Sequence, residues 1–408
     1  MTPLDMTWVR AQFPAFERAP LAGQAFFENA GGSFTCQPVI DRLFRFYQER
    51  KVQPYRPYAA SRLGGAEMDE ARARLATMLG VETDELSFGP STTQNAYVLA
   101  QAFRQSMAPG EAIVVTNQDH EANSGPWRRL AGDGIEVREW VVDPETGHLD
   151  PAGLAPLLAD GKVRLVAFPH CSNVVGEVND VAAICAMARA AGAATCVDGV
   201  SYAPHGFVDV GALGADIYLF SAYKTYGPHQ GIMVIRRALG TALPNQAHHF
   251  NGDVLYKRFT PAGPDHAQVA ASAGMADYME ALSAHHGGPR DGAAAARHAH
   301  GLMRAHEEAL LQPLLDALAA KNSARLIGPA RAAGRAPTVA VALSRPGAEA
   351  AAELADHGIM AGGGDFYAGR VLEALGVDPA RGVLRLSFTH YTAPDEVEKL
   401  IAALDKVI

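Results

Sequence analysis

The chain has 408 residues, of which 48% are hydrophobic and 19% are charged, and its formal net charge is −9. This length exceeds what one hydrophobic core commonly supports, so we expect two domains. The acidic balance argues against nucleic acid or an anionic membrane as the main partner, although it leaves room for a small anion at a local site.

Targeting and metal-binding signals are also lacking in the sequence. The first seven residues show neither the basic nor the apolar region of a signal peptide, and charged residues interrupt the long alanine-rich stretches. The four cysteines form no C-x-x-C pair. We therefore expect a cytoplasmic protein with reduced thiols, no membrane span and no zinc or other metal site.

Apolar runs alternate with helical patterns up to about residue 240. The runs expected as buried strands span residues 111–116, 163–168, 194–197, 217–220 and 232–235. Residues 181–191 are apolar at helical spacing. This alternation predicts an α/β domain with a mainly parallel sheet, in which ligands gather at the carboxyl ends of the strands.

The pattern changes after about residue 265. A long helical pattern spans 291–321, strand-like runs follow at 338–343 and 383–388, and an amphipathic helix is expected over 394–404. These elements lack the earlier regular alternation and predict a smaller α+β domain. We place the large domain at residues 18–262 and the small domain at 263–408 together with 1–17.

A lysine and an aspartate follow two neighbouring apolar runs. Asp198 comes directly after the run at 194–197, and Lys224 follows the run at 217–220 among small residues. An amine and a carboxylate offered in this way suit an aldehyde cofactor with a pyridinium ring, because the amine can form a Schiff base and the acid can hold the ring nitrogen protonated. The alternatives are a solvated loop lysine and a helix-capping or loop aspartate.

Other polar residues also stand next to expected strands and helices. Ser91, Thr92 and Thr93 precede a helical run, where hydroxyls and free N–H groups make an anion site or a plain helix cap. His120 follows the strand at 111–116, where an imidazole can stack on a flat ring, although a lone histidine is more often a surface or core residue.

Two further residues complete this set. Asn173 follows the strand at 163–168 and can donate to a phenolate oxygen. Arg385 lies in a strand of the second domain, where its guanidinium matches a carboxylate bidentately or forms a structural ion pair.

In this order, the motifs resemble the class V aminotransferase family of fold type I pyridoxal 5′-phosphate (PLP) enzymes, which includes cysteine desulfurases, selenocysteine lyases and isopenicillin-epimerase-like proteins. The resemblance runs from Phe27-Glu-Asn-Ala-Gly-Gly32 to the last helix and is strongest with a desulfurase-like branch. It implies an α/β fold with a mainly parallel sheet of seven strands, a smaller α+β C-terminal domain, PLP as the cofactor, and a homodimer with the site near the interface.

The resemblance also implies roles for single residues. Lys224 matches the Schiff-base lysine, Asp198 the acid on the pyridine nitrogen and His120 the ring-stacking histidine, and these three are the expected catalytic residues. Tyr223 stands where many members have a phosphate-binding histidine, and Ser201 stands where desulfurases often have glutamine. The residues assigned to the cofactor are Thr92, Thr93, His120, Asn173, Asp198, Ser201, Ser221, Tyr223 and Lys224. Those assigned to the substrate are Asn29, Ala30, Gly31 and Arg385, the last for an α-carboxylate.

The sequence departs from the family at two places. In Gly263-Pro264-Asp265, a loop expected from the partner subunit, proline replaces the usual threonine, which puts that phosphate contact in doubt. The segment 358–370, expected as a loop, lacks the nucleophilic cysteine of desulfurases and carries Asp365, Phe366 and Tyr367 instead. We therefore expect a cysteine-desulfurase-like protein without the persulfide mechanism.

The expected function is a PLP-dependent reaction on the amine of an amino acid or related compound, first of all transamination, with Lys224 as the general base. A lyase that eliminates sulfur or selenium without a cysteine nucleophile and an epimerase remain as alternatives. A catalytically silent cofactor-binding protein is the alternative of another class. Residues 361–370 and a site mouth formed by Tyr55, Arg56 and Arg62 are expected to decide the reaction.

Overall fold

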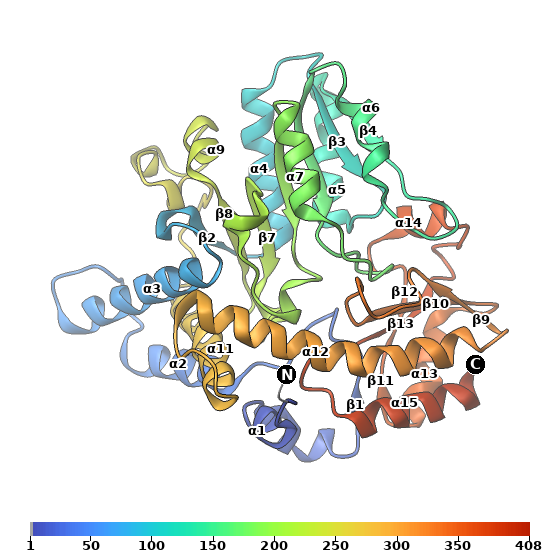
Figure 1. The fold of residues 1–408 in the computed structure, drawn as a ribbon. Coiled ribbons are helices and arrows are strands. Elements are labelled where there is room, and N and C mark those ends of the chain that lie inside the picture. Colours follow the sequence, from blue (N-terminus) through green and yellow to red (C-terminus); the bar gives the residue numbers. More distant parts are fainter. Residues whose placement is uncertain (1–2) are drawn as a thin grey trace.

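Seven strands form the mixed sheet of the larger domain in the computed structural model, which describes residues 3–408 (Figure 1). In sheet order they are β2 (Leu86–Gly89), β8 (Gly231–Ile235), β7 (Ile217–Ser221), β6 (Ala194–Asp198), β5 (Val163–Pro169), β3 (Ala112–Thr116) and β4 (Glu136–Trp140). β8 is antiparallel to both of its neighbours, and the pairs from β7 to β4 are parallel. The expected mainly parallel sheet is confirmed, whereas β2 and β4 were not anticipated.

Helices cover both faces of this sheet because its central strands are apolar on both sides. On one face, α4 (Thr92–Ser106) and α5 (Glu121–Arg128) pack on side chains such as Ile113 and Leu165. On the other face, α7 (Val181–Ala190) packs in the core that contains Val114 and Val166. The short helices α6 (Ala155–Leu158), α8 (Val210–Leu213) and α9 (Arg237–Ala242) lie in the connections.

The smaller domain contains a four-stranded antiparallel sheet, as expected for an α+β unit. Its order is β12 (Gly362–Gly364), β13 (Val383–Ser387), β10 (Thr338–Leu343) and β9 (Ala324–Ile327). The helices of this part are α12 (Gly292–Ala319), α13 (Gly347–Asp356), α14 (Gly369–Ala374) and α15 (Pro394–Val407). The carboxyl-terminal half of α12 shares a hydrophobic core with β10, β13, α13 and α15.

The segment 358–370 is more ordered than the loop that the sequence predicted. It contains β11 (Ile359–Met360), which pairs in parallel with β1 (Ala25–Phe26), and then β12. The loop prediction was wrong there because the glycines of β12 lie close to neighbouring backbone, where a Cβ on Gly363 would meet the main chain of Gly347. The longest irregular stretch of the segment is residues 365–368.

The remaining helices are α1 (Met6–Ala11), α2 (Gln37–Glu49), α3 (Ala59–Met78), α10 (His266–Ala271) and α11 (Ala273–His285). Of these, α2, α3 and α11 lie to the left of and below the large sheet in Figure 1, and α1 lies at the bottom. α10 and α11 pack against α2 and α3, so residues just after the expected boundary at 262/263 contact the chain before it. The boundary at 262/263 therefore stays a prediction. Met1 and Thr2 lie outside the described residues. They belong to the segment 1–17 that was assigned to the small domain, and they fall in the part for which no signal peptide was expected.

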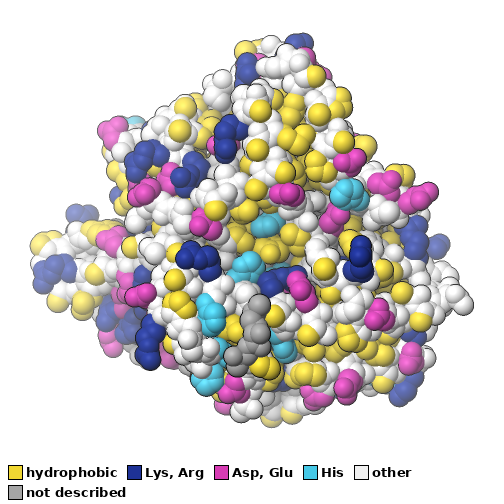
Figure 2. Space-filling model, viewed as in Figure 1, with side chains coloured by type: hydrophobic (Ala, Val, Ile, Leu, Met, Phe, Trp, Pro, Cys, Tyr) yellow, Lys and Arg dark blue, Asp and Glu magenta, His cyan; other side chains and the backbone are white. Residues whose placement is uncertain are grey.

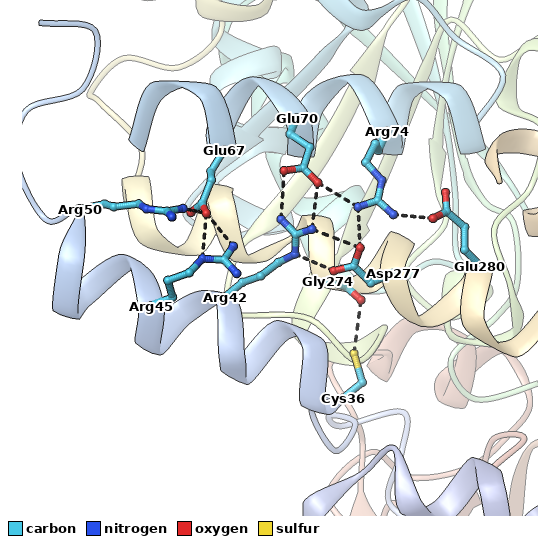
Figure 3. Close-up of polar contacts among 10 residues, drawn as sticks. All are labelled: Cys36, Arg42, Arg45, Arg50, Glu67, Glu70, Arg74, Gly274, Asp277 and Glu280. Atoms are coloured by element: carbon cyan, nitrogen blue, oxygen red, sulfur yellow. Dashed lines mark hydrogen bonds and ion pairs between the residues drawn. The ribbon is translucent and has the colours of Figure 1, made fainter. Parts of the chain in front are cut away.

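Ion pairs join α2, α3 and α11 (Figure 3). Arg42 of α2 binds Glu70 of α3 at 2.8 Å and Asp277 of α11 at 2.6 Å. Arg74 of α3 also binds Asp277, at 2.5 Å, and Glu280 at 2.6 Å. Because Arg42, Arg74 and Asp277 each have more than one charged partner, this network fixes the three helices relative to one another better than isolated surface pairs would.

Basic and acidic side chains are interspersed on the face drawn in Figure 2. Within residues 3–408, no helix is long and apolar enough to cross a membrane. No group of three or more His, Cys, Asp or Glu side chains in the same range has the arrangement of a metal site.

Candidate functional site

A cavity of about 490 Å³ lies at the carboxyl ends of β6 and β7, where the alternation of strands and helices predicted a ligand site. Its walls come from α4, the start of α5, the ends of β6 and β7, the segment 28–31, and Arg385 of β13. Every residue assigned to the cofactor or the substrate from the sequence lines this cavity except Asn29, whose side chain is buried and accepts a hydrogen bond from Tyr391.

Lys224 ends a single 3-10 turn that follows β7 directly. Burial of its amine lowers the pKa from the ordinary 10.5 to about 8, and the positive charge of Arg385 acts in the same direction. The carboxylates of Asp198 and Glu28 oppose this shift. A lysine with this pKa has a substantial fraction of neutral, nucleophilic amine at mildly basic pH, as imine chemistry requires.

Asp198 is the last residue of β6 and is buried. One carboxylate oxygen, Oδ1, accepts a hydrogen bond of 2.8 Å from the backbone N–H of Val200, which leaves Oδ2 without a protein donor among the described residues. Burial raises the pKa of Asp198 to about 6. A cationic N–H donor placed in the cavity would favour the ionised form of this acid.

A second buried acid, Asp119, also lines the cavity and was not singled out from the sequence. Burial, and then the charge of Asp198, raises the pKa of Asp119 well above its usual range. Its Oδ2 accepts a hydrogen bond of 2.6 Å from Asn123. The negative charge of Asp198 therefore disfavours the ionised form of Asp119.

His120 caps the amino end of α5, and its Nδ1 accepts a hydrogen bond of 3.0 Å from the backbone N–H of Ala122. Burial lowers the pKa of His120 to about 3, with a further contribution from Lys224. The imidazole is therefore neutral at ordinary pH, and because Nδ1 is an acceptor, its proton lies on Nε2. A neutral, flat ring in the cavity wall is suited to stacking on an aromatic ligand.

The amino end of α4 forms one end of the cavity. Ser91 caps the helix by accepting from the N–H of Gln94, and the Thr92 and Ser221 hydroxyls lie 2.8 Å apart. The first N–H groups of a helix have no partner within the helix, so this end carries free donors and a partial positive charge. A Cβ on Gly231 would lie 2.7 Å from Thr92 N, which shows how closely β8 supports this turn.

Asn173 and Arg385 also line the cavity and lie together. Asn173 Nδ2 donates to the carbonyl of Phe366 at 3.0 Å, and Arg385 Nη1 donates to the carbonyl of Asn173 at 3.3 Å. Arg385 is buried and forms an ion pair of 2.8 Å with Glu28. A structural ion pair was the alternative to carboxylate binding that the sequence left open for this arginine. Glu28 itself was missed, although it adjoins Asn29 in the motif at 27–32.

The residues expected at the mouth lie elsewhere. Tyr55, Gly263 and Pro264 line a second cavity of about 280 Å³, together with Arg72, Tyr256 and His266. Arg56 and Arg62 line neither cavity. The structure therefore brings Tyr55 and the 263–265 segment together, away from Lys224 of the same chain. The 263–265 loop is expected from the partner subunit, so its contact with the site stays a prediction. The sequence carries no signal that Tyr55 and the 263–265 segment line the same cavity, because they come from loops far apart in the chain.

The donors around the main cavity fit PLP. Free N–H groups and hydroxyls at the start of α4 suit its phosphate, the unpaired oxygen of Asp198 suits its pyridinium N–H, and neutral His120 suits the face of its ring. Tyr223 and Ser201 also line the cavity, as expected for a tyrosine at the phosphate-binding position and a serine in the place of glutamine.

Comparison with known proteins agrees with this geometry. The sequence profile of the Aminotransferase class-V family matches residues 25–400. The chain belongs to the class-V aminotransferase family. The chain is 33% identical to aminotransferase-like protein FGM3 of Gibberella zeae over 98% of both chains. It is 31% identical to a cysteine desulfurase of Serratia proteamaculans over 98% of this chain and 97% of the relative.

Solved structures show the same fold. The apo structure of a cysteine desulfurase from Thermococcus onnurineus superimposes with a TM-score of 0.86 and 23% identity, covering 100% of this chain and 99% of that one. The cysteine desulfurase CsdA of Escherichia coli gives a TM-score of 0.81 and 24% identity. The expected α/β fold of type I PLP enzymes is therefore confirmed for this chain, and the family to which it belongs is PLP-dependent.

Proposed function

We propose that the protein is a PLP-dependent enzyme that transforms the primary amine of an amino acid or related compound, with transamination as its reaction. The observation that carries this proposal is the convergence of Lys224, Asp198 and the amino end of α4 on one cavity. An inert binder has no need of a buried lysine whose pKa is lowered to about 8.

The residues present would hold the cofactor as follows. The Thr92 and Ser221 hydroxyls and the first N–H groups of α4 would bind its phosphate, with Thr93 and Tyr223 beside them. Asp198 would bind the pyridine nitrogen, and Asn173 would lie near the phenolate oxygen. PLP, when bound, supplies an electron-accepting ring that stabilises negative charge on the substrate carbon next to the amine.

Lys224 is the proposed general acid–base group of the reaction. Its Nζ would take the proton from the substrate carbon next to the amine and later return a proton. The position at which the proton is returned decides between transamination and epimerisation. The lowered pKa of Lys224 keeps the amine partly neutral for the first role. The neutral ring of His120 would hold the cofactor in place without adding a competing charge.

Elimination of sulfur or selenium is the second candidate, because cysteine desulfurases are among the similar proteins. We propose that any such reaction proceeds without a cysteine nucleophile. All four cysteines are buried, and only Cys171 lines the cavity. Burial raises the pKa of Cys171 to about 12, so a thiolate is scarce there.

We also propose that the protein forms a homodimer through α2, α3 and their connection. This region projects from the body in Figure 1 and exposes several large apolar side chains, namely Phe44, Tyr47, Val52, Tyr55, Tyr58 and Leu63. A second copy of the chain is the proposed occupant. The adjoining cavity lined by Tyr55, Gly263 and Pro264 would then lie near the interface.

The function is tested with wild-type protein and the Lys224→Ala variant, each reconstituted with PLP. We expect a visible absorbance band that borohydride removes in the wild type and that is missing in the variant. Amino acids and simple amines are then screened while keto acids or aldehydes, sulfide and the cofactor spectrum are followed. Carbonyl product without sulfide supports transamination, and sulfide from cysteine supports the second candidate. A wild-type protein that shows no such band contradicts both.

A further inference from the structure

Tyr226, two residues after Lys224, has a left-handed backbone with a φ of +65°. This conformation costs free energy for a bulky side chain and persists only where the surroundings hold it in place. Its N–H donates to Ser33 Oγ at 2.7 Å, and its carbonyl accepts from the N–H of Cys36 at 3.1 Å. The turn that carries Lys224 therefore ends at a strained residue whose backbone is fixed at both of its polar groups.

The phenol of Tyr226 belongs to a chain of hydrogen bonds with His390 and Tyr278. All three side chains are fully buried. The hydroxyl of Tyr226 donates to the carbonyl of Pro204 and lies 3.2 Å from His390 Nδ1. The hydroxyl of Tyr278 lies 2.5 Å from His390 Nε2 on the other side of the imidazole. Both nitrogens of this buried histidine therefore have a tyrosine partner.

The positions of the protons in this chain follow from its geometry. The carbonyl of Pro204 has no proton to give, so it takes the single hydroxyl proton of Tyr226, and His390 Nδ1 must donate to the phenol oxygen. Burial lowers the pKa of His390 to about 3, so the imidazole is neutral and Nε2 accepts from Tyr278. Each donor has one acceptor, and the loss of any member leaves a buried polar group unpaired.

The segments that carry the proposed site residues meet at Tyr226. Pro204 follows Asp198 in the connection between β6 and α8, and His390 follows β13, which carries Arg385. The hydroxyl of Tyr226 links the turn of the site lysine to both of these segments. A rigid support of this kind keeps a reactive group in the geometry that its reaction needs.

We propose that Tyr226 and His390 are positioning residues for Lys224, which hold its amine in place to attack the aldehyde of PLP. The inference rests on the proposed function, in which Lys224 binds this cofactor. Neither Tyr226 nor His390 lines the main cavity, so both act through the turn and not by contact with the ligand.

The test compares PLP with 4′-deoxypyridoxine 5′-phosphate, which keeps the ring and the phosphate but has no aldehyde for an amine to attack. The dissociation constant of each compound from the apo-protein is measured by fluorescence titration. Tyr226→Phe removes only the hydroxyl, and we expect it to reduce the preference for PLP about ten-fold, as the loss of a buried hydrogen bond does. The affinity for the analogue should stay unchanged, whereas a merely structural role would weaken the binding of both compounds alike.

Two substitutions of His390 keep the test decisive if Tyr226→Phe does not fold. Leucine and asparagine have similar shapes, but only asparagine offers an N–H near the place of Nδ1. His390→Leu should lower the preference for PLP, and His390→Asn should restore most of it. The same preference in both variants overturns the inference.

Trp140→Phe is the matched control, because it also removes a buried aromatic donor to a backbone carbonyl, that of Asp150. Trp140 ends β4 at the edge of the large sheet and does not line the cavity, so both affinities should stay unchanged. An unchanged preference in Tyr226→Phe, or an equal loss of both affinities, overturns the inference alone. A wild-type protein that binds both compounds equally and shows no absorbance band sensitive to borohydride overturns the proposed function as well.

Discussion

Opposing charges act on the amine of Lys224. Burial and Arg385 lower its pKa, while Asp198 and Glu28 raise it, and burial is the largest influence. Because each of these neighbours lies on a different element, the reactivity of Lys224 depends on the whole cavity and not on the local sequence. Single substitutions of the neighbours should therefore tune the amine without touching it.

We predict that the rate at which apo-protein is labelled by PLP and borohydride rises with pH to a plateau, with a midpoint at about 8. Asp198→Asn should move the midpoint down, since it removes a negative charge that favours the ammonium form. Arg385→Gln should move it up by removing a repelling cation. The trapped adduct on Lys224 is measured by mass spectrometry, and a midpoint near the ordinary 10.5 would refute the role of burial.

The same shift affects stability. Below about pH 8, Lys224 is charged in both folded and unfolded chains, and burying this charge costs free energy. Between about 8 and 10.5 the folded chain prefers the neutral amine, so this cost is relieved as the pH rises. The free energy of unfolding therefore rises with pH in this range, whereas it would fall for a lysine that an ion pair stabilises.

At the scale of single elements, two neighbouring hydroxyls at the start of α4 have different roles. The hydroxyl of Ser91 caps the helix, whereas that of Thr92 is directed to Ser221 at the proposed phosphate site. The cap stabilises the folded chain with or without a ligand. The second hydroxyl matters chiefly when the phosphate is bound.

We predict that Ser91→Ala lowers the free energy of unfolding of the apo-protein by about 1 kcal/mol, as the loss of a helix cap does. Thr92→Val should instead weaken PLP binding about ten-fold, which corresponds to one lost hydrogen bond to a charged group. Denaturant unfolding of the apo-protein and fluorescence titration with PLP measure the two effects. Equal effects of both variants on binding would contradict this division of roles.

Whole elements of the fold were predictable where one periodic pattern decides the structure. β10 spans the expected residues 338–343, and α12 lies within the expected 291–321, because apolar spacing alone specifies each. β2, β4 and the antiparallel direction of β8 were not predictable, since strand order and direction depend on distant partners. β12 was missed because its three glycines carry no side-chain pattern.

The candidate site likewise contains residues that the sequence predicts and contacts that it does not. Lys224 and Asp198 stand out because each follows a buried strand of the central sheet, so the sequence predicts that they meet at its edge. The contact of Glu28 with Arg385 joins residues 357 positions apart and has no local signal. Tyr55, Arg56 and Arg62, expected at the mouth, do not line the cavity of the same chain, and no local signal in the sequence decides their position.

At the scale of the whole molecule, the exposed apolar surface of α2 and α3 should control assembly. We predict that the double variant Phe44→Glu, Leu63→Glu shifts the protein from dimer to monomer, because both side chains are at least half exposed, at 62% and 50%, and would place charges in the interface. Sedimentation equilibrium measures the change.

Val141→Glu is the control for this prediction, because Val141 is 58% exposed and follows β4, the strand at the other edge of the large sheet. It should leave the assembly state unchanged. A wild-type protein that sediments as a monomer at every concentration would refute the proposed dimer, and equal effects of the two sets of substitutions would place the interface elsewhere.

The pairing of residues near the start of the chain with residues near its end governs when the site can exist. Ala25 pairs with Ile359, Glu28 bridges to Ser387, and Glu28 contacts Arg385. At roughly 5–20 residues per second, a ribosome needs on the order of 20–70 s to add the residues between Glu28 and Arg385. The cavity is thus completed only when almost the entire chain has been synthesised. Loss of the last 24 residues or so would leave a nascent protein that has Lys224 and Asp198 but no Arg385 with which to finish the site.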